Sequence, residues 1–163
     1  MPDEDAVTRS RDAYYQIREA RLEDAGAVAE LAGGLALSFA FRRDRFEKNY
    51  AALLADEHAR LLVAAGAGAA TTALGYLLGF EHLTFYANGP VGWVEEVYVT
   101  GERRASGVGR ALMDEFERWA AERGCALVAL ATRRAAPFYR ALGYEESATY
   151  FRKVLAERPE PGA

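Results

Sequence analysis

The sequence contains little cysteine and little histidine, which limits the chemistry that it can support. Its single cysteine, Cys125, has no partner for a disulfide within the chain, and its neighbours in CALVALAT are typical of a small buried residue. The two histidines, His58 and His82, are isolated and have no metal-ligand spacing around them. We therefore expect a buried packing role for Cys125, a surface or packing role for each histidine, and no metal site.

The sequence also lacks an excess of positive charge. Its formal net charge is -4 and its pI is near 5.3, whereas an extended nucleic-acid surface needs clustered, uncompensated Lys and Arg to displace phosphate counterions. We therefore expect no nucleic-acid partner, and any anion that the protein binds should be held by local geometry.

No segment has the composition of a signal peptide or of a membrane span. Residues 1–12 are polar with mixed charge, which favours a cytoplasmic protein. The uncharged run over residues 61–80 has Gly, Ala and Thr at its centre and divides into two β-type runs around GAGAATT. We interpret it as a buried hairpin and expect no contact with a membrane.

Apolar periodicity divides the remaining sequence into strands and helices. We expect one domain over residues 13–156 between flexible ends at 1–12 and 157–163. The predicted strands are 14–20, 60–65, 73–83, 93–99, 125–132 and 149–155, and the predicted helices lie within 21–35, 43–57, 107–123 and 136–144. Strands and helices alternate only in the second half, which favours an α+β domain with a mixed sheet and helices on both faces.

Local signals refine three of these elements. Asp24 is available as a cap of the first helix, and Gly33 and Gly34 are expected to end or bend that helix. Gly124 should close the third helix as a C-terminal cap. The strand over 125–132 is fully apolar, which is typical of a strand in the middle of a sheet.

The segment RRASGVGRAL, residues 103–112, places two glycines between a predicted strand and a predicted helix. Free backbone N–H groups at a helix N-terminus converge on one point, which suits a phosphate. Gly107 and Gly109 lack a Cβ, so a pyrophosphate could approach the backbone closely. Arg104 and Arg110 could add charge at the rim. The alternative is a tight turn flanked by solvated arginines.

Two nucleotide-binding motifs do not fit this segment. The dinucleotide fingerprint needs a small residue where Leu112 stands, and it needs a carboxylate that the following ALVALAT does not offer. The P-loop needs a Gly-Lys-Ser/Thr ending, which is absent.

The segment VEEVYVTGERRASGVGRALM resembles the pyrophosphate-binding signature, Arg/Gln-x-x-Gly-x-Gly/Ala, of the GNAT superfamily of acetyl-CoA-dependent N-acetyltransferases. Arg104, Gly107 and Gly109 occupy its fixed positions. The segment APFYRALGY is similar to the second signature of the family, an aromatic pair on a short helix before Gly and an aromatic residue. The order of elements matches the family from about residue 14 to residue 155. Both signatures in this order are much more specific than the first alone.

The resemblance implies a three-layer α/β/α fold with a mixed, mostly antiparallel sheet, and acetyl-CoA as co-substrate without a metal. It implies that the co-substrate is bound by Val97, Tyr98, Val99, Arg104, Ala105, Ser106, Gly107, Val108, Gly109, Arg110 and Thr132. The family often has asparagine where Thr132 stands. Threonine offers a hydroxyl but no amide there.

The resemblance also implies direct transfer, in which an amine attacks the thioester carbonyl and the thiolate leaves. Tyr139 matches the tyrosine that protonates this thiolate in the family, and the oxyanion donor is a backbone N–H on the strand 97–99. Glu95 matches a base that some members use, and Glu96 could instead orient a cationic substrate or face solvent. Strand alternation predicts that Glu95 shares a face with Val97, and a β-bulge would exchange the two roles.

Three functions stay open at this point. The first is acetylation of a primary amine on a small molecule, the second is acetylation of a protein N-terminus or lysine, and the third is non-catalytic binding of acyl-CoA. Substrate choice is expected to lie in the aromatic-rich segments 33–46 and 80–93. Apolar strands near the C-terminus leave a homodimer open.

Overall fold

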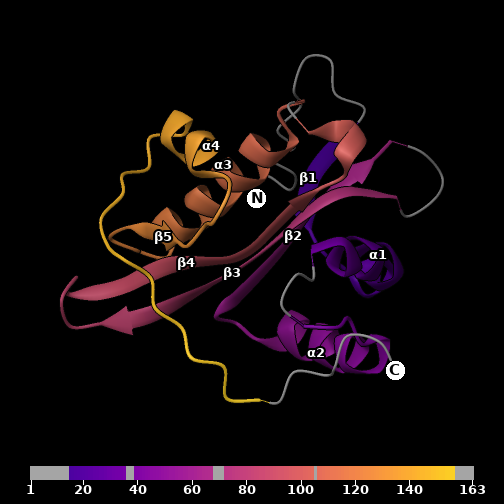
Figure 1. Cartoon of the computed structure of the whole chain (residues 1–163), viewed down its shortest axis with the longest axis horizontal. Helices are drawn as coiled ribbons and strands as arrows, with labels where there is room; N and C mark the ends of the chain where they lie inside the picture. Colours follow the sequence, from indigo (N-terminus) through magenta and orange to yellow (C-terminus); the bar gives the residue numbers. More distant parts are fainter. Residues whose placement is uncertain (1–14, 36–38, 68–71, 105, 157–163) are drawn as a thin grey trace, which may run out of the picture.

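A computed structural model describes residues 15–35, 39–67, 72–104 and 106–156 of the chain. The predicted flexible ends, 1–12 and 157–163, lie outside these residues. A sheet of five strands forms its centre, with helices on both faces (Figure 1). The strands, in sheet order, are β1 (Tyr15–Glu19), β2 (Ala59–Gly66), β3 (Ala73–Thr84), β4 (Gly89–Val99) and β5 (Val128–Leu130). The first four pair antiparallel, and β5 pairs parallel with β4.

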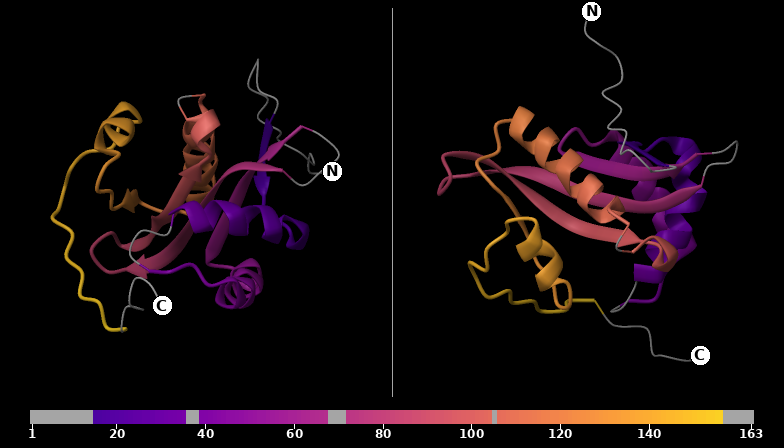
Figure 2. Two further views of the ribbon diagram at one scale, coloured as in Figure 1. Left: turned by 45° about the vertical axis from the view of Figure 1, so that its right-hand side comes forward. Right: turned by 90° about the horizontal axis from the view of Figure 1, so that it is seen from above.

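Two helices cover each face of this sheet. The helices are α1 (Ala25–Leu35), α2 (Arg43–Ala55), α3 (Val108–Glu122) and α4 (Ala136–Ala141), with short 3-10 helices at Leu22–Asp24 and Gly101–Arg103. α1 and α2 lie on one face, and α3 and α4 lie on the other (Figure 2). The predicted three-layer α+β fold with a mixed, mostly antiparallel sheet is confirmed.

Strand alternation gives the sheet two separate cores. On the α3 side, the side chains with 0% exposure include Leu62, Leu77, Leu112, Met113 and Phe116. On the α1 and α2 side, the buried residues include Val28, Leu31, Tyr50, Val63 and Tyr76. The uncharged run 61–80 forms parts of β2 and β3, as predicted. Among the described residues, no helix is long and apolar enough to cross a membrane.

Glycines follow two of the helices directly, and Gly124 closes α3 as the sequence predicts. Gly124 follows α3 with φ of 78°, and Gly143 follows α4 with φ of 92°, both in the left-handed region that glycine adopts readily. Gly107 precedes α3 with φ of 88°. Each would strain a side-chain-bearing residue.

Gly33 and Gly34, in contrast, do not end α1, which continues to Leu35. A Cβ on Gly34 would lie 2.6 Å from the hydroxyl oxygen of Tyr98 on β4. Gly34 therefore lets α1 approach the sheet closely, because a Cβ there would force the ring of Tyr98 to shift. The glycine pair in the sequence therefore indicates close packing of α1 on β4 and not the end of the helix.

Asp24 also differs from the prediction. Instead of capping α1 as its N-cap residue, its buried carboxylate accepts two hydrogen bonds from Arg18, at 2.7 and 2.9 Å, and one from the backbone N–H of Arg21 at 2.8 Å. The hydrogen bonds from Arg18 lower the pKa of Asp24 below its usual value. The pair joins β1 to the start of α1.

The C-terminal part of the sheet is smaller than predicted. β5 has three half-buried residues and lies at the edge of the described sheet, and the predicted strand 149–155 is not a strand in this structure. Residues 145–156 run outside the sheet in each ribbon view (Figures 1 and 2). Propensity alone predicted these strands, whereas a strand also needs a neighbour.

Candidate active site

β4 contains a bulge at its pair of glutamates. In the pairing with β3, Leu78 lies opposite Glu96, but Gly79 lies opposite Val94, so Glu95 is an extra residue in β4. The side-chain alternation of β4 therefore changes at this point.

Because of the bulge, Glu95 lies on the face opposite α3. Gly92 faces α3, so Trp93 faces the other way, and its indole Nε1 donates to the carboxylate of Glu95 at 2.9 Å. Val97 and Val99 pack with the core on the α3 side. The prediction that Glu95 shares a face with Val97 is wrong, because it held only for unbroken alternation. The bulge was expected to exchange the roles of the two glutamates, but it places both on the same face, so their roles stay predictions. Glu95 is exposed to solvent.

Glu96 is half-buried on the α1 and α2 side. It accepts a hydrogen bond of 2.8 Å from the hydroxyl of Tyr76, whose side chain is 1% exposed. Burial, together with the charge of Glu96, raises the pKa of Tyr76, so Tyr76 stays neutral and remains a donor. Both glutamates therefore lie on one face of the sheet, and only Glu96 is held by a buried partner.

Beyond the bulge, β4 separates from β5. The two strands pair only where Gly92–Val94 meets Val128–Leu130. The carbonyl of Val99 accepts a 3.4 Å hydrogen bond from Arg104. The backbone of Val99 therefore points away from β3, toward the edge of β4 where β5 no longer pairs. Val97, two residues earlier, presents its N–H to the same side. In the described structure this stretch pairs with β3 on its other edge, and no strand pairs with it on this side.

A cleft of about 560 Å³ fills the space between this backbone and α4. It is lined by Val97, Tyr98, Val99, Arg103, Arg104, Gly107, Gly109, Arg110, Ala135, Phe138, Tyr139, Ala141 and Leu142. The cleft therefore joins strand β4, the N-terminus of α3 and the short helix α4.

The N-terminus of α3 faces this cleft. In the first turn of α3 the backbone N–H groups have no acceptor within the helix, and the helix dipole makes this end positive. Gly107 and Gly109 leave the backbone open there. A Cβ on Gly109 would lie 3.2 Å from the ring of Phe138, so this glycine also lets α4 pack against α3.

Three arginines place positive charge around the same end of the cleft. Arg103, Arg104 and Arg110 line it, and the guanidinium of Arg104 lies 5.7 Å from the centre of the Tyr98 ring. Arg110 donates to the carbonyl of Ala141 at 3.4 Å. An anion at the start of α3 would meet backbone donors and guanidinium groups together.

Tyr139 lies on the opposite wall of the cleft. Its ring packs edge-on against Phe138 and Tyr144, with ring centres 4.9 and 5.9 Å apart. Burial raises the pKa of Tyr139, so the phenol stays protonated at neutral pH. The hydroxyl of Tyr144 donates instead to Glu117 at 2.7 Å. Of these two tyrosines, Tyr139 is therefore the one that lines the cleft.

Three described residues that are predicted to bind the co-substrate do not line the cleft, and a fourth lies outside the described residues. The side chain of Val108 is fully buried in the core, and the hydroxyl of Ser106 donates to the carbonyl of Arg103. The hydroxyl of Thr132 accepts the backbone N–H of Ala135 at 3.1 Å, at the start of α4. Ala105 lies outside the described residues. Roles for these four stay predictions.

The cleft also contains residues that sequence reasoning missed. Arg103, Ala135, Phe138, Ala141 and Leu142 line it. Phe138 and Leu142 lie within the segment APFYRALGY, so helical spacing around Tyr139 could have identified them. No grouping of His, Cys, Asp and Glu in the described part of the chain is suited to a metal ion.

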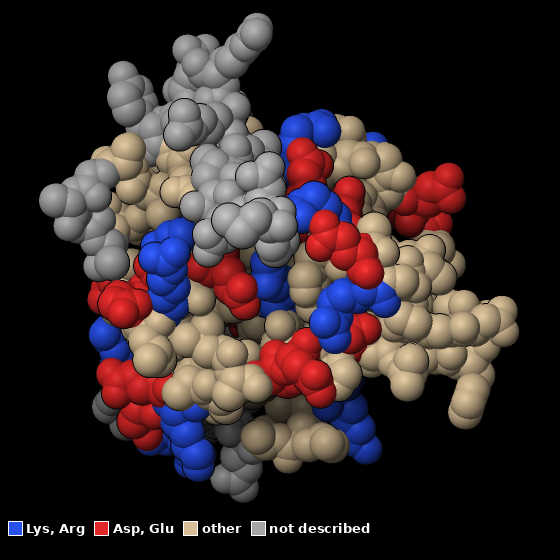
Figure 3. Space-filling model, turned by 180° about the vertical axis from the view of Figure 1, so that it is seen from behind, with Lys and Arg blue, Asp and Glu red and all other residues tan. Residues whose placement is uncertain are grey.

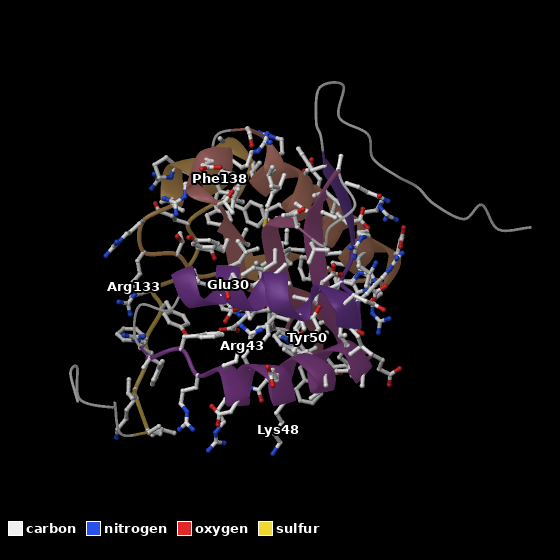
Figure 4. All side chains as sticks on the ribbon, turned by 90° about the vertical axis from the view of Figure 1, so that its right-hand side faces the viewer. Glu30, Arg43, Lys48, Tyr50, Arg133 and Phe138 are labelled. Carbon is white, nitrogen blue, oxygen red and sulfur yellow. The ribbon has the colours of Figure 1, made fainter. Side chains whose placement is uncertain are left out.

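The two predicted substrate segments lie at opposite ends of β4. The chain after α1 includes the exposed Phe39 and Phe41, and Gly34 brings the end of α1 over Tyr98. Glu30 and Arg43 face each other between α1 and α2, 3.6 Å apart (Figure 4). The turn between β3 and β4 is about 20 Å along the strand from the bulge. The expectation that segment 80–93 contributes to substrate choice stays a prediction.

Comparisons with known proteins agree with this geometry. The sequence model of the Acetyltransferase (GNAT) family matches residues 15–144. The chain is 33% identical to an aminoglycoside N(6')-acetyltransferase type 1 of Stenotrophomonas maltophilia over 90% of this chain and 95% of the relative. It is 32% identical to a protein of the same name from Acinetobacter haemolyticus over 63% and 75%. Glucosamine-6-phosphate N-acetyltransferase of Arabidopsis thaliana has the same fold, with a TM-score of 0.77, 18% identity and coverage of 87% and 99%.

Proposed function

Because the chain belongs to the acetyltransferase (GNAT) family and acetylates a small-molecule amine, we propose that its acceptor is the 6'-amine of an aminoglycoside. Two relatives above 30% identity carry that activity in their names. The single observation that carries the proposal within this structure is the β4 bulge, which places the carboxylates of Glu95 and Glu96 on one face. Aminoglycosides are polycations, and such a pair suits two ammonium groups.

Acetyl-CoA binds, in this proposal, along the cleft between β4 and α4. Its pyrophosphate lies at the first turn of α3, near Gly107 and Gly109, with Arg104 and Arg110 at the rim. Its thioester lies beside Val97, where the free N–H of β4 would donate to the oxyanion. The backbone N–H groups at the start of α3 and the N–H of Val97 on β4 would then line the same cleft.

The chemical step then uses two side chains. The neutral amine attacks the thioester carbonyl, the carbon–sulfur bond of the tetrahedral intermediate breaks, and the amine proton passes to Glu95 directly or through water. Tyr139 gives its proton to the leaving thiolate and recovers one from solvent. Because burial raises the pKa of Tyr139, it is in the required acid form before the reaction begins.

Glu96 has a different role in this proposal. The hydroxyl of Tyr76 already donates to it, which fixes the position of its carboxylate. We assign Glu96 to hold a second ammonium group of the acceptor, and the exposed Glu95 to accept the proton, which it can then release to water. The hydrogen bond from Tyr76 therefore distinguishes the proposed binding carboxylate from the proposed reacting one.

A direct test is the release of free thiol from acetyl-CoA with a matched pair of aminoglycosides, one with an amine at the 6' carbon and one with a hydroxyl there. We expect turnover with the amine only, and mass spectrometry should find one added acetyl group. Peptides with a free N-terminus or lysine serve as the comparison set. Turnover with the peptides and none with either aminoglycoside would contradict the proposal.

A further inference from the structure

Glu95 lies on a part of β4 that neither neighbouring strand holds in place. In the pairing with β3 it is the extra residue of the bulge, and the pairing with β5 ends one residue earlier, at Val94. Its side chain is exposed, and a glutamate side chain in water samples many rotamers. The backbone alone therefore does not fix the position of this carboxylate.

Trp93, two residues earlier, lies on the regular part of the same strand. It pairs with Phe80 of β3 on one side and with Ala129 of β5 on the other, and its side chain is half-buried. Tyr150 stacks on its ring, with ring centres 6.5 Å apart. The indole therefore has a fixed place beside the glutamate.

A hydrogen bond joins these two side chains. The indole Nε1 of Trp93 donates to the Oε2 atom of Glu95 at 2.9 Å. In the described part of the chain, the carboxylate of Glu95 has no other hydrogen bond and no ion pair. An indole N–H is a donor only, so it can hold the carboxylate but cannot take the proton of an amine. The Oε1 atom of Glu95 stays free to accept that proton.

Glu96 shows the same arrangement with a buried donor. The hydroxyl of Tyr76 donates to the Oε2 atom of Glu96 at 2.8 Å, so each carboxylate is held through one oxygen by an aromatic donor. On the face of the molecule seen in Figure 3, acidic and basic side chains are interspersed, so a polycation meets no uniformly acidic surface among the described residues there. This favours recognition through the placement of individual carboxylates.

We propose that Trp93 is the positioning residue of Glu95: its N–H keeps one carboxylate oxygen in place, so that the other oxygen meets the proton of the attacking amine. This inference rests on the proposed function, in which Glu95 accepts that proton. Trp93 touches no reacting atom itself. Without the indole donor the carboxylate is free to rotate, and a reacting group displaced by about 1 Å can lose on the order of a hundredfold in rate.

The indole signals of a ¹⁵N-labelled sample test the contact without a substrate. The chain has two tryptophans, and Trp119, buried on α3, serves as the internal reference. Glu95→Ala should move the indole N–H signal of Trp93 upfield, because the donor loses its charged acceptor, and should leave the signal of Trp119 in place. Trp93→Phe assigns the signal by its loss. A Trp93 signal that Glu95→Ala does not move would overturn the proposal.

A double-mutant cycle tests whether Trp93 acts through Glu95. Trp93→Phe keeps an aromatic ring but removes the donor, and it should lower kcat about tenfold with KM for the aminoglycoside nearly unchanged. In a Glu95→Gln background the same change should lower kcat less than about twofold, because the group that it positions is absent. Trp119→Phe is the matched control and should keep its kcat. Equal losses in the two backgrounds, or full kcat in Trp93→Phe, would overturn the proposal.

The choice of acceptor separates this inference from the proposed function. Aminoglycoside turnover that Trp93→Phe does not lower would overturn the role of Trp93 and leave the acceptor assignment intact. Turnover of the peptides alone would overturn the acceptor assignment, and the cycle is then measured with the peptides, where we expect the same pattern of losses. A wild-type chain that turns over neither acceptor would overturn both.

Discussion

Two stretches of backbone, one in β4 and one in β5, each have one edge without a neighbouring strand among the described residues, and the surroundings of these two edges are opposite in character. Val97–Val99 of β4 faces a cleft with a helix N-terminus, arginines and Tyr139. Val128–Leu130 of β5 is apolar and lies beside exposed aromatic side chains. The first stretch suits an anionic thioester, and the second suits another strand. Charge and glycine content therefore distinguish a ligand edge from an interface edge.

The largest expected effect concerns the anion end of the ligand edge. Gly109→Glu should weaken CoA binding by on the order of a hundredfold, because it adds a carboxylate and a Cβ that would lie 3.2 Å from Phe138. Gly101→Glu is the matched control, since a Cβ there meets nothing within 4 Å. Calorimetry with CoA measures both. Equal affinities in the two variants would remove the pyrophosphate assignment.

The next effect concerns the acid on the other wall of the cleft. Tyr139→Phe should fold normally and lower kcat by roughly ten- to a thousandfold, with little change in KM for acetyl-CoA. Tyr144→Phe, which loses only the hydrogen bond to Glu117, is the control and should keep its turnover. Steady-state kinetics decide the matter. Full activity of Tyr139→Phe would reduce that residue to a packing role.

A smaller effect should separate the two glutamates at the bulge. Glu95→Gln should lower kcat about tenfold or more, because it removes the proposed proton acceptor. Glu96→Gln and Tyr76→Phe should leave kcat nearly unchanged and mainly raise KM for the aminoglycoside, because they disturb the same binding carboxylate. Steady-state kinetics with the aminoglycoside measure this difference. A larger loss of kcat in Glu96→Gln than in Glu95→Gln would exchange the two roles.

The smallest effect on either edge should come from Asp24, which lies far from both. Its pKa is lower in the folded chain than in the unfolded one, so the ionised group stabilises the fold above about pH 4 and this stabilisation is lost as the pH falls. Asp24→Asn should lower the free energy of unfolding by roughly 3 kcal/mol at neutral pH. Urea titration at several pH values should show a smaller loss in acid, with kcat unchanged. An equal loss at every pH would contradict the ionic role.

Local chemistry made the ligand edge predictable from the sequence. Gly107 must adopt a positive φ before a helix, and Gly109 must admit close neighbours, so both appear as a pattern within a few residues. The aromatic pair at Phe138 and Tyr139 is likewise local. These signals do not depend on which strand lies beside which.

The parts that sequence reasoning got wrong depend on distant pairings. The bulge at Glu95 exists only relative to Leu78 on β3, so unbroken alternation assigned Glu95 to the wrong face. Gly34 resembles a helix end until the position of Tyr98 is known. The segment 125–132 is apolar, as a central strand would be, but its sequence does not show which neighbour covers it. In the structure only Val128–Leu130 of this segment form a strand, and that strand lies at the edge of the described sheet.

The most direct test of this account is a titration with CoA followed by backbone amide NMR. We predict that the largest shift changes occur at Val97, Val108 and Gly109, and that the amides of Val128–Leu130 change little. Changes centred on Val128–Leu130, with Val97 and Gly109 unaffected, would contradict the assignment of the two edges.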